Sequence, residues 1–171
     1  ASELGLVADR VLQLDVTDSV SVAAMAEELK GVTIDLLINN AGTKGHMGNN
    51  FADTDWDKIG WTFEVNSIGP MRVTQALLPN LLAGKGKSIV HISSVMASIA
   101  GNQGGYYGYR ASKTALNMLN SSLAKELSSD GITAVVLHPG WVRTELGGAQ
   151  APVTTDVSVA GMLKVIDGLS I

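Results

Sequence analysis

Two residues that could carry out proton transfer, Tyr109 and Lys113, lie at positions i and i+4. Side chains at this spacing share one face of an α-helix. A free tyrosine has a pKa of about 10 and is a poor acid or base at neutral pH, but a nearby ammonium favours the phenolate and lowers that pKa. Such a pair can protonate a carbonyl oxygen or deprotonate an alcohol. The spacing alone equally fits an exposed tyrosine beside a solvated lysine.

Small polar residues follow two of the apolar runs that we expect to be strands. Ser93 and Ser94 come after one run, and a serine hydroxyl there can hold a substrate oxygen by a hydrogen bond. Asn39-Asn40-Ala41-Gly42 comes after another, and asparagine and glycine there allow a close backbone approach to a flat ligand. Ordinary turn chemistry explains both groups equally well when each is taken alone.

Asn66 lies inside an expected helix among the apolar residues Phe63, Val65 and Ile68. A buried amide needs hydrogen-bond partners. Pro70 lacks an N–H and so frees a backbone carbonyl one turn earlier, close to Asn66. The pattern predicts a local kink at Asn66 that could hold a water molecule.

Composition excludes several classes of protein. The chain has 171 residues and a net charge of −4, with no basic stripe to bind nucleic acid, and it has no cysteine for disulfides or thiolate sites. His46, His91 and His138 have no metal-site spacing, so we expect them to be structural or exposed. We expect no membrane span and no signal peptide, and hence a cytoplasmic protein.

Apolar runs alternate with stretches of helical periodicity along the whole chain. The pattern predicts strands at Val11–Leu14, Ile34–Ile38, Ser88–Ile92 and Ile132–Leu137. It predicts helices at Ser19–Lys30 capped by Thr17 or Asp18, Trp56–Leu82 capped by Thr54 with Asp57, Tyr107–Ser128, and Asp156 to the end. This order predicts one α/β domain over residues 1–171, a doubly wound parallel sheet of Rossmann type with its site at the carboxyl ends of the strands.

The order and spacing of these motifs together resemble the classical short-chain dehydrogenase/reductase family. Asp15-Val16, the Asn-Asn-Ala-Gly turn, Asn66, Ser93-Ser94, Tyr109-x-x-x-Lys113 and Pro139-Gly140 carry the resemblance, which covers essentially the whole chain. The runs Gly-Tyr-Tyr-Gly-Tyr-Arg-Ala-Ser-Lys and His-Pro-Gly-Trp-Val-Arg-Thr are similar to those of C-factor and sniffer-like carbonyl reductases.

The resemblance implies a role for each matching residue. Tyr109 would be the acid/base, Lys113 would lower its pKa and hold the nicotinamide ribose, Ser94 would bind the substrate oxygen, and Asn66 would hold a water in a proton relay. The implied cofactor contacts are Asp15 and Val16 at the adenine, Asn40, Ala41 and Gly42 along the cofactor, and Pro139, Gly140, Val142 and Thr144 at the nicotinamide end. Ser94 precedes Tyr109 by 15 residues, slightly more than is usual in the family, and Ser98 is the alternative.

The family's phosphate-binding turn, Gly-x-x-x-Gly-x-Gly, does not occur in this sequence. In the family's strand order 3-2-1-4-5-6-7, the matching part lacks strands 1, 2 and 7, so the resemblance implies a truncated domain of about four parallel strands. A gap of about 10–15 Å would separate strands 3 and 4 at the usual spacing. Either the protein is longer than this sequence, or the chain folds differently. For the second case our hypothesis is that Val11–Leu14 pairs directly with Ile34–Ile38 and closes the gap.

Two functions follow from the resemblance. The first is an NAD(P)-dependent oxidoreductase that reduces a carbonyl or oxidises an alcohol, with NADP favoured over NAD. The alternative is a catalytically silent fragment, an interaction or structural module that has lost cofactor binding with the phosphate turn. The implied partners are a small carbonyl or alcohol substrate and a second copy of the chain, bound through the helices around 56–82 and 107–128. The loops Gly45–Asn50 and Thr144–Thr155 would shape the substrate pocket.

Overall fold

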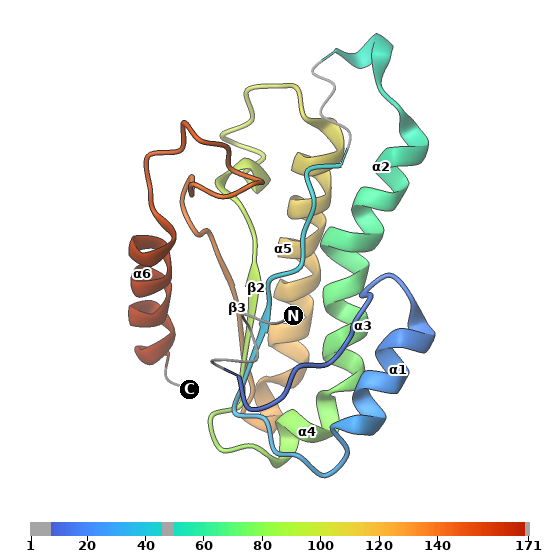
Figure 1. Ribbon diagram of the computed structural model, residues 1–171, viewed down its shortest axis with the longest axis vertical. Coiled ribbons are helices and arrows are strands. Elements are labelled where there is room, and N and C mark those ends of the chain that lie inside the picture. The colour runs from blue at the N-terminus through green and yellow to red at the C-terminus, as the bar shows by residue number, and fades with distance from the viewer. Residues whose placement is uncertain (1–7, 46–49, 170–171) are drawn as a thin grey trace.

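The computed structural model describes residues 8–45 and 50–169. Within them, three parallel strands form one sheet in the order β1-β2-β3: β1 is Leu36–Asn39, β2 is Ser88–Ile92 and β3 is Thr133–Leu137. The helices are α1 (Ser19–Glu28), α2 (Trp56–Phe63), α3 (Gly69–Ala76), α4 (Leu78–Ala83), α5 (Tyr107–Leu127) and α6 (Thr155–Asp167). The predicted α/β class with parallel strands is confirmed (Figure 1).

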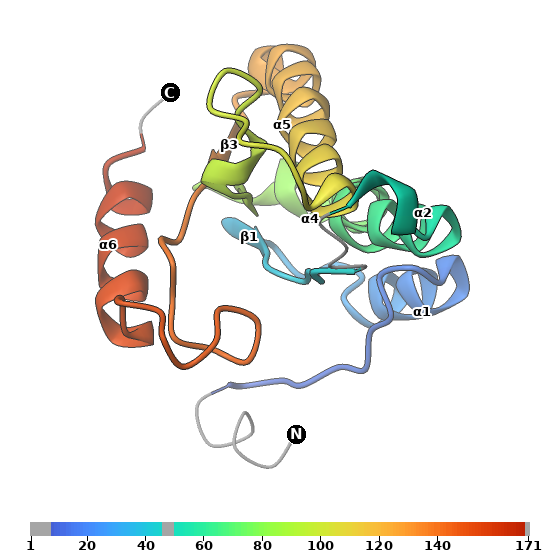
Figure 2. The same cartoon turned by 90° about the horizontal axis from the view of Figure 1, so that it is seen from above.

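The helices lie on both faces of the sheet, as expected of a doubly wound fold. Figure 2 shows α1, α2 and α5 on one side of the sheet and α6 on the other. Two apolar clusters fill the first side: Leu81, Ile89, Leu127, Ile132 and Ala134 form one, and Val22, Met25, Val73 and Leu77 form the other. Alternate strand residues face these clusters, because successive side chains of a strand point to opposite faces.

The prediction of a strand at Val11–Leu14 is wrong, and so is its predicted pairing with Ile34–Ile38. The segment makes no strand in the described structure; Leu12 packs against the cluster around Val22, whereas Val11 and Leu14 are exposed. β1 is therefore an edge strand, and its Leu36 and Ile38 are 36% and 43% exposed. An extended apolar segment becomes a strand only where a second strand supplies backbone partners.

The predicted long helix from Trp56 to Leu82 is interrupted in the middle. A π-helical turn, Glu64–Ile68, separates α2 from α3, and Gly69 N–H donates to the Glu64 carbonyl five residues earlier. This turn lies where the kink at Asn66 was predicted, next to the proline that cannot donate. The N-cap of α2 is Asp55, whose carboxylate accepts from Lys58 N–H at 3.1 Å, so the predicted cap at Thr54 with Asp57 is wrong.

The starts of α1, α5 and α6 lie within one residue of the predicted positions, whereas α6 ends at Asp167 and does not run on as predicted. Asp18, one of the two predicted caps, accepts a hydrogen bond from Val20 N–H at the start of α1. α5 begins after Tyr106, a non-glycine residue with φ of 50°. Among the described residues no helix is long and apolar enough to cross a membrane.

Candidate active site

The candidate site lies at the carboxyl ends of the three strands. Asn40-Ala41-Gly42 follows β1, Ser93-Ser94 follows β2 and Pro139-Gly140 follows β3, while Tyr109 lies in the first turn of α5 at the same end of the sheet (Figure 1). Parallel strands bring these separate segments together, because all their carboxyl ends meet at one edge. The fold thus brings segments that are spread over about 100 residues of sequence to the same edge of the sheet.

Ser94 and Tyr109 are brought into contact by this arrangement. The Ser94 side chain lies close enough to the Tyr109 phenol to influence its pKa, and the Ser94 hydroxyl accepts from Met96 N–H at 3.1 Å. The alternative, Ser98, accepts from Gly101 N–H at 3.0 Å and is exposed. Of the two serines, Ser94 is therefore the one whose hydroxyl lies next to the Tyr109 phenol.

The pKa of Tyr109 is raised above its ordinary value, because burial disfavours the phenolate. The Ser94 side chain opposes this and lowers the pKa. Lys113 is not among the causes of this shift, so the expectation that it lowers the pKa of the phenol stays a prediction. A tyrosine with its ordinary pKa of about 10 is already protonated at neutral pH, and burial adds to this preference, so the phenol is in the form that donates a proton.

Lys113 is buried beneath the site, with 5% of its surface exposed. Its ammonium donates to the Ile92 carbonyl at 2.7 Å, and burial lowers its pKa to about 8. A Cβ placed on Gly42 would lie 3.5 Å from Lys113 Nζ and 3.4 Å from Asn66 Oδ1. Gly42 therefore leaves open the space above both polar groups.

Asn66 is fully buried in the π-helical turn and joins three segments. Its Oδ1 accepts from Thr43 N–H at 2.8 Å, and its Nδ2 donates to the Thr43 carbonyl at 2.9 Å and to Ser112 Oγ at 3.0 Å. Both amide hydrogens are therefore used by protein partners. The side chain fixes the turn after β1 to α5, which carries Tyr109 and Lys113.

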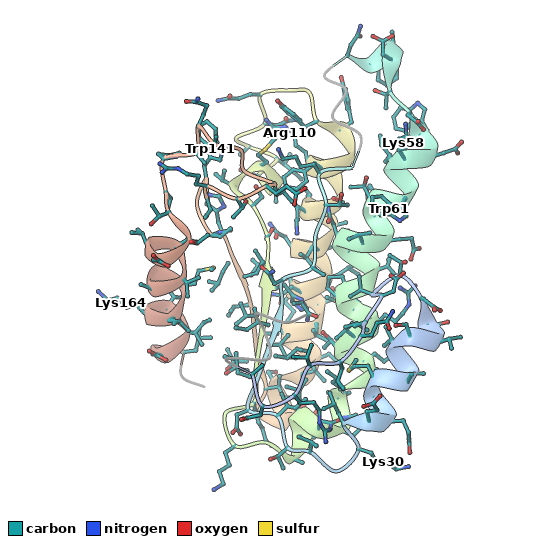
Figure 3. The ribbon with its side chains drawn as sticks, in the orientation of Figure 1. Lys30, Lys58, Trp61, Arg110, Trp141 and Lys164 are labelled. Atoms are coloured by element: carbon teal, nitrogen blue, oxygen red, sulfur yellow. The ribbon has the colours of Figure 1, made fainter. Side chains whose placement is uncertain are left out.

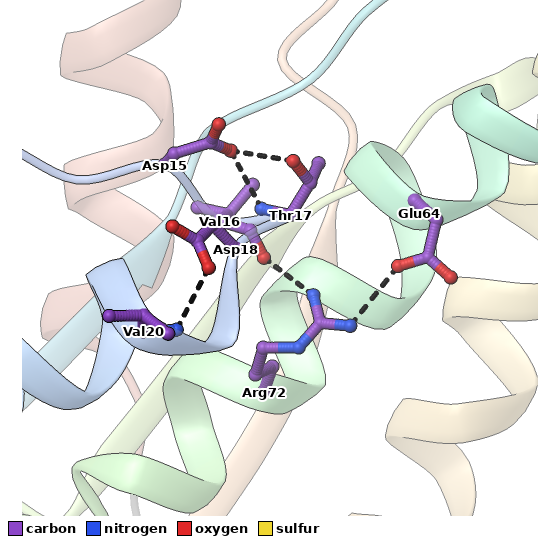
Figure 4. A network of polar contacts seen from close by, with 7 residues as sticks. All are labelled: Asp15, Val16, Thr17, Asp18, Val20, Glu64 and Arg72. Carbon is purple, nitrogen blue, oxygen red and sulfur yellow. Dashed lines mark hydrogen bonds and ion pairs between the residues drawn. The ribbon is translucent and has the colours of Figure 1, made fainter.

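Asp15 and Val16, the residues predicted at the adenine, lie in a polar network at the start of α1 (Figure 4). The Asp15 carboxylate accepts from Thr17 N–H at 2.9 Å and from Thr17 Oγ at 2.7 Å, and these bonds lower its pKa. Arg72 donates to the Val16 carbonyl at 2.7 Å and pairs with Glu64 at 3.1 Å. Sequence reasoning missed Arg72, because its partner is a backbone group distant in sequence.

The predicted nicotinamide turn is anchored to the segment before α6. Ser158 Oγ donates to the Pro139 carbonyl at 2.6 Å, and Val142 forms a bridge with Val153. Thr144 accepts from Gly147 N–H at 3.0 Å, and Gly140 has a φ of +88°, which favours glycine. A groove of about 270 Å³ lies here, lined by Leu137, His138, Pro139, Gly140, Val153, Val157, Ser158, Gly161, Met162 and Val165.

The other predicted features around the site have mixed outcomes. Asn40, Ala41 and Gly42 are exposed along the edge of the site, open to a ligand. Most of the Gly45–Asn50 loop, predicted to shape the pocket, lies outside the described residues, as does His46. The described part of the chain holds no group of three or more potential metal ligands from His, Cys, Asp and Glu.

A buried polar cluster behind the site was not foreseen. Asn39 Nδ2 lies 3.0 Å from Thr74 Oγ1 and 3.2 Å from His91 Nδ1, which join the ends of β1 and β2 to α3. His91 is fully buried, and its Nε2 has no hydrogen-bond partner among the described residues. Burial, and secondarily the charge of Lys113, lowers the pKa of His91 to about 4.

Acid should therefore destabilise the fold through His91. The pKa of His91 in the folded chain lies below its ordinary value of 6.5, so the unfolded chain binds a proton at higher pH than the folded chain does. The free energy of unfolding is therefore highest above pH 6.5 and decreases as the pH falls to about 4. This difference corresponds to about 3 kcal/mol. Urea unfolding at pH 7 and 4.5 should show this loss in the parent chain and a smaller one in His91→Gln. His138 is the comparison: burial also lowers its pKa, but the residue is exposed, so His138→Gln should lose less of the parent's acid sensitivity than His91→Gln does. Equal losses of stability in all three chains would contradict the prediction.

Comparison with known proteins agrees with this geometry. The family model of the short chain dehydrogenases matches residues 2–153. The C-signal of Myxococcus xanthus is 46% identical over 138 residues, which cover 80% of this chain and 82% of that protein. NADPH-bound carbonyl reductase from chicken fatty liver superposes with a TM-score of 0.88 at 36% identity, covering 99% of this chain and 76% of that one. Carbonyl reductase Sniffer of D. melanogaster gives a TM-score of 0.91 at 29% identity, with coverage of 99% and 76%. The chain belongs to the short chain dehydrogenase family, as an oxidoreductase similar to carbonyl reductases.

Proposed function

We propose that this protein reduces a carbonyl compound, or oxidises the corresponding alcohol, with a nicotinamide cofactor and with Tyr109 as the acid/base. The observation that carries the proposal is that the Ser94 hydroxyl lies against the Tyr109 phenol, one helical turn before the buried Lys113 on α5. Two neighbouring hydroxyl groups can both act on the oxygen of a carbonyl substrate as it becomes an alcohol. One donates a hydrogen bond to that oxygen, and the other transfers a proton to it.

The residues present fit the nicotinamide end of such a cofactor. Gly42 leaves space above Lys113 and Asn66, so that the Lys113 ammonium can bind a ribose hydroxyl there. The Pro139–Thr144 turn and the apolar groove beneath it would hold the nicotinamide ring. Asp15 would accept a hydrogen bond at the adenine end. A bound nicotinamide would supply the hydride, which is chemistry that no side chain provides.

The side chains then perform the proton transfer. Ser94 would donate its hydroxyl hydrogen to the substrate oxygen, while Met96 N–H occupies one of the two acceptor lone pairs of that hydroxyl. Tyr109 would donate its proton to that oxygen, and burial keeps the phenol protonated until then. The Lys113 cation would stabilise the phenolate that remains. For alcohol oxidation the same groups would act in reverse.

We further propose NADP rather than NAD, because the similar carbonyl reductase from chicken fatty liver holds NADPH. The sequence has no Gly-x-x-x-Gly-x-Gly turn for the pyrophosphate, so cofactor binding is measured before turnover. NADPH fluorescence titration, followed by the loss of absorbance of NADPH with a panel of aldehydes and ketones, tests both steps. Turnover with NADPH above that with NADH is expected. No binding at millimolar cofactor would favour the catalytically silent alternative.

We also propose that two copies associate through α2, α3 and α5. A groove of about 440 Å³ between α3 and α5 is lined by Ile68, Met71, Arg72, Thr74, Gln75, Leu78, Leu123, Glu126 and Leu127. Trp61 and Met118 are 53% and 68% exposed on α2 and α5. Light scattering should give the mass of an oligomer for the parent and a lower mass for Met118→Glu. Val159→Glu, on α6, should leave the mass unchanged; a monomeric parent would contradict the proposal.

A further inference from the structure

The loop from Val95 to Tyr106 separates Ser94 from Tyr109, and Arg110 lies across its two ends. Arg110 Nη1 donates to the Met96 carbonyl at 3.4 Å, and Nε donates to the Gly104 carbonyl at 3.2 Å. Figure 3 shows Arg110 at the start of α5, beside this loop. One side chain thus holds together two points of the loop that are eight residues apart.

Polar contacts, more than apolar burial, hold this loop in place. Its tip is open to solvent, with Ile99 79% exposed. At its end, Gly104, Gly105 and Tyr106 have φ values of 81°, 64° and 50°, a left-handed path that its sequence alone favours only at the glycines. Thr114, also on α5, donates from its Oγ1 to the Ala97 carbonyl at 2.9 Å.

Arg110 is connected to the candidate site through Met96. The Met96 carbonyl accepts from Arg110, and the Met96 N–H donates to Ser94 Oγ. Ser94 in turn contacts Tyr109, which precedes Arg110 on α5. The Arg110 guanidinium and the Tyr109 phenol therefore project from the same helical turn. The phenol lies against the Ser94 hydroxyl directly, and the guanidinium is connected to it through Met96.

We propose that Arg110 is a positioning residue, which holds Met96 so that the Ser94 hydroxyl stays against Tyr109. This inference rests on the proposed function for its effect on turnover. Arginine is suited to the role because Nε and Nη1 belong to one rigid plane and can donate to two carbonyls at once. Lysine has its donors on one nitrogen at the end of a flexible stem and lacks the planar fork, so it would hold the two carbonyls less rigidly.

Three variants of the full chain test the role: Arg110→Met, Arg110→Lys and, as a control, Lys125→Met. Lys125 is exposed on the last turn of the same helix, so its variant removes an equal charge far from the loop. Amide hydrogen exchange resolved by residue should be faster at Met96 and through the loop in Arg110→Met, intermediate in Arg110→Lys and unchanged in Lys125→Met. This measurement needs neither cofactor nor turnover.

Kinetics give the second measurement. Arg110→Met should lower kcat by about tenfold to a hundredfold, since a displaced catalytic group costs this much, with the KM for NADPH unchanged. In a Ser94→Ala background the same substitution should have no further effect, because Arg110 acts through Ser94. Unchanged exchange at Met96 in Arg110→Met, or an equal loss of kcat in the Ser94→Ala background, would overturn the proposal. A parent chain without turnover refutes the proposed function, and the exchange result then decides the role of Arg110 alone.

Discussion

Replacing Tyr109 by phenylalanine should lower kcat by a factor of about 10² to 10⁴, the usual contribution of a positioned acid or base. The substitution removes one hydroxyl and keeps the ring, so the half-buried packing of Tyr109 at the start of α5 is preserved. Ser94 would still bind the substrate oxygen, and the KM for the carbonyl compound should therefore change little. Steady-state consumption of NADPH with the best carbonyl substrate gives both constants.

Tyr107→Phe is the matched control for this variant. Tyr107 lies two residues earlier on α5, is 37% exposed and stacks edge-on with Phe51 at 5.9 Å, away from the Ser94 hydroxyl. The same chemical change there should leave kcat within about twofold, because surface substitutions have small effects. If Tyr109→Phe kept more than a tenth of the parent's kcat, another group would have to supply the proton.

Replacing Asn66 by alanine should destabilise the fold by about 2–4 kcal/mol. The side chain is fully buried and makes three hydrogen bonds, to the N–H and carbonyl of Thr43 and to Ser112. Alanine leaves these partners without the amide in a site that water reaches poorly. Turnover should also fall, because the turn that carries Gly42 loses its attachment to α5. Urea unfolding at pH 7 measures the first effect.

Asn117→Ala provides the comparison for Asn66. Asn117 is a half-buried asparagine on α5, and it accepts one hydrogen bond, from Ser93 Oγ at 2.6 Å. Asn117→Ala should lower the free energy of unfolding by about 1 kcal/mol, the usual net contribution of one hydrogen bond. Equal destabilisation by the two variants would mean that the three contacts of Asn66 do not act together.

Much of the fold could be predicted because local signals and tertiary structure agree. The strands at Ser88–Ile92 and Thr133–Leu137 are apolar on both faces, and the helix after Tyr107 has a continuous stripe of small and apolar residues. Val11–Leu14 failed for a tertiary reason: its residues suit a strand, but no described strand lies beside it. The cap at Asp55 was not predicted, because Thr54, Asp55 and Asp57 lie close together and threonine and aspartate are both common N-cap residues.

The site was predictable to the extent that its residues follow the strands. Parallel topology alone places Gly42, Ser94 and Gly140 at one edge. The contacts that hold them could not be predicted, because they join side chains to backbone groups: Arg110 to Met96, and Asn66 to Thr43. A backbone carbonyl has no signature in the sequence, so nothing distinguishes these residues from solvated ones.

Transfer of deuterium from NADPH that carries deuterium at both C4 positions of the nicotinamide tests the central claim most directly. The parent chain, given this cofactor and a carbonyl substrate, should yield an alcohol heavier by about one mass unit at the former carbonyl carbon, as direct hydride transfer requires. Tyr107→Phe should give the same product, and Tyr109→Phe should give almost none. An alcohol formed without deuterium, or no alcohol at a cofactor concentration that saturates binding, would contradict the account.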